Sequence, residues 1–134
     1  RWGGVRAGDR APDVALGSGE TTIFRLLGEG KLVALFARAD ADLAACFDRL
    51  GVRVCVLGDD DPAARRIYGS SPNDVWLLRP DGYVLLRCRT TERELLRAML
   101  AKVWAPGAVD VALGPRLDAQ NASVVLRRVA IAAV

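Results

Sequence analysis

Histidine is absent from this sequence, and only 3 of its 134 residues are cysteine. Without histidine the chain cannot form Ser–His or Cys–His catalytic dyads, and it lacks the commonest zinc ligand. Cys46, Cys55 and Cys88 form no Cys-x-x-Cys pair and show no metal-ligand spacing. We therefore predict no metal-binding residue. An odd number of cysteines in apolar patterns also indicates a reducing compartment, and we expect the cytoplasm.

Lysine is scarce as well, because Lys31 and Lys102 are the only two in a chain whose formal net charge is +3. The arginines are scattered among acidic residues rather than gathered beside aromatic ones, so we expect no nucleic-acid partner. No apolar run reaches the roughly 18 residues of a membrane helix. No charged-then-apolar leader opens the chain, so we expect no membrane partner either.

The chain has the length and composition of one globular domain, with 51% apolar and 26% charged residues. It begins with Arg1 rather than Met, so we treat it as a processed protein or as a piece of a longer one. We expect two parts, a domain over residues 1–105 and an extension over residues 106–134.

The apolar pattern predicts alternating strands and helices. Continuous apolar runs are typical of buried strands, and apolar residues three and four apart are typical of helices packed on them. The expected elements are a strand at Leu32–Phe36, a helix capped by Asp40 or Asp42 and ended by Gly51, a strand at Val52–Leu57, a helix from Asp61 to Gly69, a hairpin over 74–89, and a helix opened by a capping box of Thr91 and Glu94. This β-α-β-α-β-β-α order predicts an α/β fold of the thioredoxin-like type.

The hairpin is the organising element of this predicted fold. Pro80 presets φ for a turn, and Gly82 adopts positive φ without a steric penalty. The flanking runs, Val75–Leu78 and Tyr83–Leu86, are nearly continuous in apolar residues, so we expect the hairpin to be covered on both faces.

Smaller expectations concern the segments around these elements. They are an edge strand at Val14–Leu16, a short helix within Thr21–Leu27 ended by Gly28, packing of Ile67 and Tyr68, one buried helix face made of Leu95, Leu96, Met99, Leu100 and Val103, and a strand at Ala108–Leu113. Residues 117–134 contain no Gly or Pro and end in the apolar run 124–134, which suits a helix or a strand equally. We expect this extension to pack on the domain or on a partner.

The sequence lacks the groups that thioredoxin-like redox chemistry uses. That chemistry needs two cysteines at the start of the first core helix, where the helix N-terminus stabilises a thiolate. Residues 37–42 contain no cysteine, and the place of the fold's usual cis-proline falls near Asp74. The run Asp59–Asp61 reads as a loop and helix cap rather than a metal site. We assign no catalytic residue and expect no disulfide exchange.

Cys46 offers one alternative. Its place after the first core strand resembles that of a peroxidatic cysteine, but residues 43–45 are Leu, Ala and Ala, where peroxiredoxins have Thr and Pro. No hydroxyl donor stands three residues before it. We favour a core cysteine that is buried and reacts slowly, and we keep a peroxiredoxin-like thiol enzyme using Cys46 as the alternative.

Two segments together resemble one family. Residues 7–14 read Ala-Gly-Asp-Arg-Ala-Pro-Asp-Val, and residues 74–84 read Asp-Val-Trp-Leu-Leu-Arg-Pro-Asp-Gly-Tyr-Val. Both resemble the C-terminal domain of FAD-dependent aromatic-ring hydroxylases of the phenol hydroxylase and polyketide hydroxylase type. In that family the domain is similar to thioredoxin without the cysteine pair. The resemblance covers roughly residues 7–104.

The resemblance implies a parent protein that hydroxylates an aromatic substrate with FAD, NAD(P)H and oxygen. The flavin and substrate sites of such a parent lie mainly in its N-terminal domains, which would be this chain's partners. The sequence has no Gly-x-Gly-x-x-Gly segment, so no flavin-binding residue is carried over and no cofactor is assigned to this chain.

We therefore predict a non-catalytic C-terminal domain of such a monooxygenase, with a structural or dimerisation role and a homodimeric parent. Besides the thiol enzyme, a stand-alone interaction module whose extension pairs with a partner is a second alternative.

Overall fold

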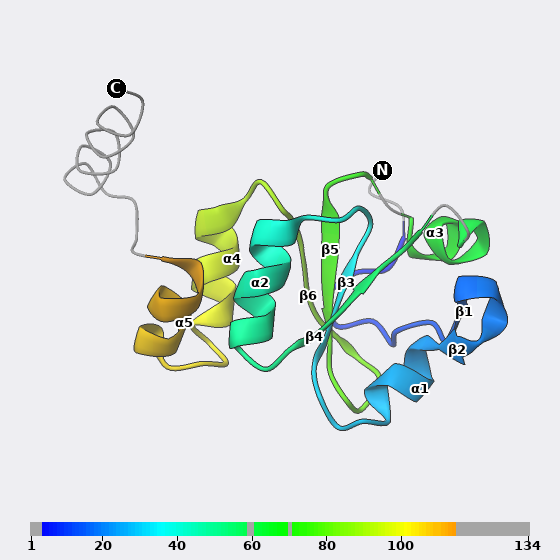
Figure 1. The fold of residues 1–134 in the computed structure, drawn as a ribbon, viewed down its shortest axis with the longest axis horizontal. Coiled ribbons are helices and arrows are strands. Elements are labelled where there is room, and N and C mark those ends of the chain that lie inside the picture. Colours follow the sequence, from blue (N-terminus) through cyan, green and yellow to red (C-terminus); the bar gives the residue numbers. More distant parts are fainter. Residues whose placement is uncertain (1–3, 59–60, 70, 115–134) are drawn as a thin grey trace.

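The structure, a computed structural model, describes residues 4–58, 61–69 and 71–114. A central sheet has α1 and α3 on one face and α2 and α4 on the other, and α5 packs on α2 and α4 (Figure 1). The elements are β1 (Ala15–Leu16), the short 3-10 helix η1 (Gly17–Gly19), β2 (Thr21–Thr22), α1 (Ile23–Leu27), β3 (Val33–Phe36), α2 (Ala41–Arg49), β4 (Arg53–Val56), α3 (Pro62–Tyr68), β5 (Asp74–Leu78), β6 (Val84–Arg89), α4 (Arg93–Leu100) and α5 (Pro106–Leu113).

The strand order of the central sheet is β4-β3-β5-β6. β3 and β4 are parallel, with Val33 opposite Arg53, and β5 runs antiparallel to both β3 and β6. From β3 to α4 the elements follow the predicted β-α-β-α-β-β-α order. The mixed α/β class and this order are therefore confirmed.

The apolar core forms on both faces of the sheet. In β3, Val33 and Leu35 pack under α1 and α3, whereas Ala34 and Phe36 pack under α2 and α4. All four residues of β3 are fully buried, which explains why this central strand is a continuous apolar run. Among the described residues, no helix is long and apolar enough to span a bilayer.

The predicted hairpin is present and its turn is tight. Gly82 has a φ of 92° and donates to the carbonyl of Arg79 at 2.9 Å, and the Arg79 amide donates to Tyr83 at 2.8 Å. β5 is buried along its whole length, as expected, but β6 alternates between buried and half-exposed residues. The expectation that both strands are covered on both faces was therefore wrong for β6, which lies at the edge of the sheet.

Residues 8–11 cover the edge of β6 at its start. The Gly8 amide donates to the Val84 carbonyl at 2.8 Å, and the Val84 amide donates back to Asp9 at 2.8 Å. Ala11 donates to Gly82 at 2.7 Å. The strand expected at Val14–Leu16 forms only at Ala15–Leu16, and it pairs with β2 in a separate two-stranded sheet. The central sheet offers it no edge there, because residues 8–11 already occupy that position.

Helix ends are only partly as predicted. Asp40 caps α2 by accepting from the Leu43 amide at 3.0 Å. The capping box of Thr91 and Glu94 does not form, because α4 begins at Arg93, and the Glu92 carboxylate instead accepts from the Arg89 amide at 3.0 Å.

The packing expected of two helices needs correction. Tyr68 is fully buried, but Ile67 is 47% exposed. In α4, Leu96 and Leu100 lie one turn apart and face the sheet, whereas Leu95 and Val103 are exposed. The face is narrower than expected because Arg97 is buried beside it, where it contacts α5.

The strand expected at Ala108–Leu113 was wrong, because these residues belong to α5. Pro106 stands at the first position of this helix, where proline is well tolerated. Val109 and Ala112 are buried against the other helices. Asp110 accepts from Arg97 at 2.7 Å. The rest of the predicted extension, residues 115–134, lies outside the described residues.

These packing assignments predict unequal effects of truncating two apolar side chains. Phe47 is fully buried and meets Phe36 edge-on, with ring centroids 5.8 Å apart. Phe47→Ala should lower the free energy of unfolding by about 3–5 kcal/mol, because it leaves a cavity. Ile67→Ala is the control and should change it by no more than about 0.5 kcal/mol. Urea denaturation measures both; similar losses would contradict the assignment.

Candidate functional site

The place where a thioredoxin-like redox centre is expected lies at the carboxyl ends of β3 and β4. A hollow of about 460 Å³ opens there, lined by Ala37, Arg38, Ala39, Val56, Leu57, Gly58, Arg65 and Pro72. None of these residues is a thiol. Arg65 donates to the carbonyls of Ala37 and Leu57 at 3.1 and 3.0 Å. Its guanidinium thus ties the end of β3 to the end of β4.

None of the three cysteines lines this hollow; Cys46 and Cys88 are buried and Cys55 is half-buried. Cys46 is 8% exposed and packs on the apolar face of α2. Burial, followed by the nearby carboxylates of Glu92 and Asp74, raises the pKa of the Cys88 thiol to about 12. Burial also raises the pKa of Cys55. A raised pKa keeps these two thiols protonated and weakly nucleophilic at neutral pH.

Metal ligands are not brought together either. Within the described part of the chain, no group of three acidic or cysteine side chains could hold a metal ion. Asp59 and Asp60, from the acidic run that the sequence singles out, lie outside the described residues. The third member, Asp61, accepts from the amides of Gly17 and Gly58 at 2.8 and 3.1 Å, which connects η1 to the loop before α3.

Asp74, near which a thioredoxin-like fold was predicted to have its cis-proline, is the first residue of β5 and is buried. Its backbone carbonyl accepts from the Ala37 amide at 3.0 Å, which joins the end of β3 to the start of β5. Its carboxylate accepts from the Ser71 amide at 2.8 Å and from Arg87 at 2.9 Å. The side chains of Asp74 and Arg87 are only 3% and 14% exposed, so this ion pair is buried.

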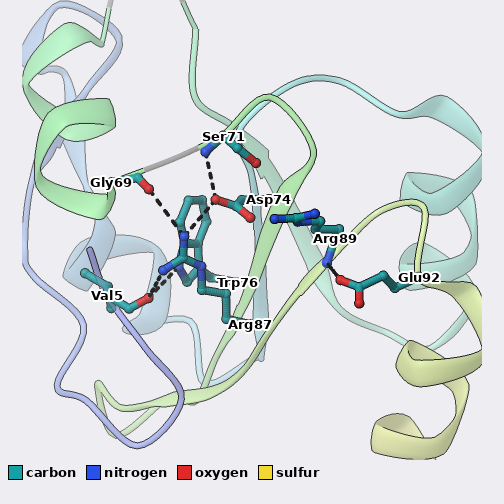
Figure 2. Close-up of polar contacts among 8 residues, drawn as sticks. All are labelled: Val5, Gly69, Ser71, Asp74, Trp76, Arg87, Arg89 and Glu92. Carbon is teal, nitrogen blue, oxygen red and sulfur yellow. Dashed lines mark hydrogen bonds and ion pairs between the residues drawn. The ribbon is translucent and has the colours of Figure 1, made fainter. Parts of the chain in front are cut away.

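Arg87 extends this pair into a cluster (Figure 2). Its guanidinium donates to the carbonyls of Val5 and Gly69 at 3.1 and 3.3 Å, and it lies 5.3 Å from the centre of the Trp76 ring. The Trp76 indole N–H donates to the same Val5 carbonyl at 3.0 Å. The Asp74–Arg87 cluster therefore joins the N-terminal segment, the end of α3 and both strands of the hairpin.

The N-terminal segment approaches the end of α3 closely. The Val5 amide donates to the Tyr68 carbonyl at 3.2 Å. Gly4 has a φ of 89°, and a Cβ at this position would lie 2.1 Å from the Tyr68 carbonyl oxygen. Only glycine fits here, so the local sequence and the cluster together fix the path of the N-terminal segment.

A second hollow, of about 250 Å³, lies beside the cluster. Its lining comprises Arg6, Ala7, Asp74, Arg87, Cys88, Arg89 and Glu92. Acidic and basic side chains alternate around it, and two of them form the buried pair described above. The thiol in this lining, Cys88, is one whose pKa burial raises.

Sequence reasoning singled out Asp74 but missed Arg87 and Val5. One signal was present, because Trp76 lies opposite Arg87 in the hairpin and Asp74 lies opposite Arg89. Alternate residues of a strand point to the same face, so Asp74 and Arg87 are diagonal neighbours. Val5 could not be found in this way, because its contact is made by a backbone carbonyl 82 residues away in sequence from Arg87.

Comparison with known proteins identifies the family of this chain. The profile of the family described as aromatic-ring hydroxylase, C-terminal, matches residues 5–106. This chain belongs to that family. The resemblance proposed from residues 7–14 and 74–84 is thereby confirmed. A search of curated proteins found no significant match.

Solved structures share the fold. Aklavinone-11 hydroxylase, in a ternary complex with FAD and aklavinone, is 24% identical over 79% of this chain and 21% of its own, with a TM-score of 0.50. OxyS anhydrotetracycline hydroxylase from Streptomyces rimosus is 24% identical over 83% and 21%, with a TM-score of 0.53. The flavin-dependent monooxygenase PieE is 24% identical over 81% and 20%, with a TM-score of 0.50. This chain thus spans about a fifth of each.

Replacing Arg87 should lower the free energy of unfolding of this domain more than replacing Arg79, because only Arg87 belongs to the buried pair. Arg87→Met leaves the Asp74 carboxylate buried without its cation and should lower the free energy of unfolding by about 3–5 kcal/mol. Arg79→Met removes the ion pair with Asp81, in which both side chains are about half exposed, and should cost no more than about 1 kcal/mol. Chemical denaturation of both variants gives the comparison, and equal costs would argue against a buried pair.

Proposed function

We propose that this chain is the C-terminal domain of an FAD-dependent aromatic monooxygenase and that its own role is structural rather than catalytic. The family match over residues 5–106 carries this proposal. The hydroxylases that share the fold are about five times longer than the matched region, so the chemistry of a protein of this kind has ample room outside this domain. The names of two of them, aklavinone-11 hydroxylase and anhydrotetracycline hydroxylase, suggest that the parent hydroxylates a related compound.

The residues of this chain do not fit a dinucleotide. In the β3-α2-β4 unit, where a pyrophosphate would bind at the start of α2, residues 37–40 contain no glycine to allow close backbone approach. The carboxylate of Asp40 already occupies the N-terminus of α2, where it would repel a phosphate. FAD and NAD(P)H are therefore assigned to the other domains of the parent, and we derive no step through them here.

The Asp74–Arg87 cluster supports a positioning role. In a C-terminal domain, the segment around Val5 is the part of the domain nearest in sequence to the domains that precede it. The cluster holds this segment against the sheet through one carbonyl that accepts two hydrogen bonds. We propose that this fixes the orientation in which the chain meets the flavin domains, its partners, and that the parent is a cytoplasmic homodimer.

Flavin binding tests whether this chain has a cofactor site of its own. The chain is expected to purify without flavin and to leave the fluorescence of added FAD unchanged, because no residue here binds a dinucleotide. Stoichiometric FAD binding or NAD(P)H-dependent hydroxylation by this chain alone would contradict the proposal. The coding region upstream of Arg1 gives an independent check, since an in-frame flavin-binding domain is expected there.

The thiol-enzyme alternative has its own test. Cys46 is buried, so native protein treated with peroxide should form no sulfenic acid at this position, whereas the urea-unfolded chain should react with a thiol reagent at all three cysteines. Mass spectrometry of the labelled peptides, with Cys46→Ser as the control, measures this. Rapid sulfenylation that disappears in the Cys46→Ser variant would favour the peroxiredoxin-like reading.

A further inference from the structure

The N-terminal segment is attached to the rest of the domain at two places. At the first, the Val5 carbonyl accepts from Arg87 and from the Trp76 indole (Figure 2). At the second, residues 8–11 bond to the chain around the start of β6. Residues 4–7, which we call the latch, lie before and between these places, and Val5 attaches the latch to the Asp74–Arg87 cluster.

A glycine with positive φ stands at each end of this stretch. The φ angle is 89° at both Gly4 and Gly8. Their surroundings differ, because a Cβ at Gly4 would lie 2.1 Å from the Tyr68 carbonyl oxygen, whereas a Cβ at Gly8 would meet nothing within 4 Å. Close packing of the latch against the end of α3 therefore requires glycine at residue 4, whereas residue 8 favours glycine for its φ angle alone.

We propose that the latch and the Asp74–Arg87 pair form one two-state unit, in which the pair is intact while the latch is closed and comes apart when the latch leaves. The Val5 carbonyl serves two donors of the cluster, so its departure removes an acceptor from Trp76 and from Arg87 at the same moment. Leaving a buried donor without its acceptor is costly. Intermediate positions of the latch therefore gain nothing, and the unit opens and closes as a whole.

The hollow beside the cluster allows this unit to open without unfolding the domain. Asp74 and Arg87 both line this hollow of about 250 Å³, which is large enough for water. Water that enters it can solvate both charges once the latch has left, which removes the cost of burying them unpaired. The backbone pairing of β5 with β3 and β6 involves none of the latch residues, so the central sheet can stay intact.

Under the proposed function, the latch links the position of the preceding domains to the hairpin. The chain of the parent enters this domain through Gly4, so a movement that draws this segment away from α3 would break the pair. The pair would then be intact only in arrangements of the parent that leave the latch closed. This consequence rests on the proposed function, whereas the two-state unit is tested on this chain alone, so the two can fail separately.

Hydrogen exchange in the full chain tests the unit. The Val5 amide, which donates to Tyr68 at 3.2 Å, and the Trp76 indole N–H should exchange with the same opening free energy. This energy should depend little on urea, because opening exposes little surface. Both groups should exchange at least about tenfold faster than global unfolding allows, with the amides of the central strand β3 as the reference. Exchange of both groups only through global unfolding would overturn the proposal, and so would different opening energies for the two.

Two glycine variants give a matched comparison. Gly4→Ala places a Cβ against the Tyr68 carbonyl and should hold the latch open, so that the Trp76 indole N–H exchanges at least about tenfold faster than in the unchanged chain. Gly8→Ala has the same positive φ without the clash and should keep this exchange within about twofold.

The guanidinium of Arg87 reports on the pair in the same variants. Slow rotation of this group, seen by NMR as separate Nη proton signals, should be present in the unchanged chain and in Gly8→Ala and lost in Gly4→Ala. Separate Arg87 signals in a Gly4→Ala chain whose indole exchange is fast would show that the pair does not depend on the latch. Unfolding of the whole Gly4→Ala chain, seen as loss of its near-UV circular dichroism, would contradict local opening.

Discussion

The buried ion pair between Asp74 and Arg87 is the interaction on which the arrangement of this domain depends. Removing two charges from water is costly, and mutual attraction offsets that cost only when the remaining donors and acceptors are satisfied. Here the Ser71 amide and the carbonyls of Val5 and Gly69 meet this condition. The pair therefore cannot form unless the N-terminal segment, the end of α3 and the hairpin all reach their places.

Arginine plays the same part at several other points. Arg65 joins the carbonyls that follow β3 and β4, Arg49 reaches the carbonyl of Ala112, and Arg97 donates to Asp110 and to the Gly114 carbonyl at 2.6 Å. These carbonyls lie at the ends of helices and strands, where regular backbone pairing stops. A guanidinium has five N–H donors in a planar fork, whereas a lysine ammonium is a single point of charge. At these points one arginine can therefore bind two separate oxygen atoms, as Arg65 and Arg97 do.

At the positions where a thioredoxin-like redox centre was expected, this domain has residues that pack or form ion pairs. Asp74, near which the sequence analysis expects the cis-proline of a thioredoxin-like fold, forms a buried ion pair with Arg87. Cys46 and Cys88 are core side chains, and the hollow at the carboxyl ends of β3 and β4 contains arginine and small apolar residues instead of thiols. These observations fit a domain that positions other parts of a hydroxylase, which is the role we propose for it.

The residue pattern predicted the four strands of the central sheet, the order of elements from β3 to α4 and the hairpin turn. Each of these depends on local rules: continuous apolar runs for buried strands, helical spacing, and a Pro-Asp-Gly turn. The sequence also excluded chemistry that needs histidine or a Cys-x-x-Cys pair, since folding cannot supply residues that the chain lacks. Tertiary structure alone decided that Ala108–Leu113 is a helix, because burial of Val109 and Ala112 against other helices settles a pattern that suits either structure. The exposure of Ile67 and Leu95 also became clear only from the tertiary structure, since a helix buries only the face that meets the sheet. The partner of Asp74 was partly visible in the hairpin register, but the contact with Val5 was not, because a backbone carbonyl leaves no trace in the residue pattern.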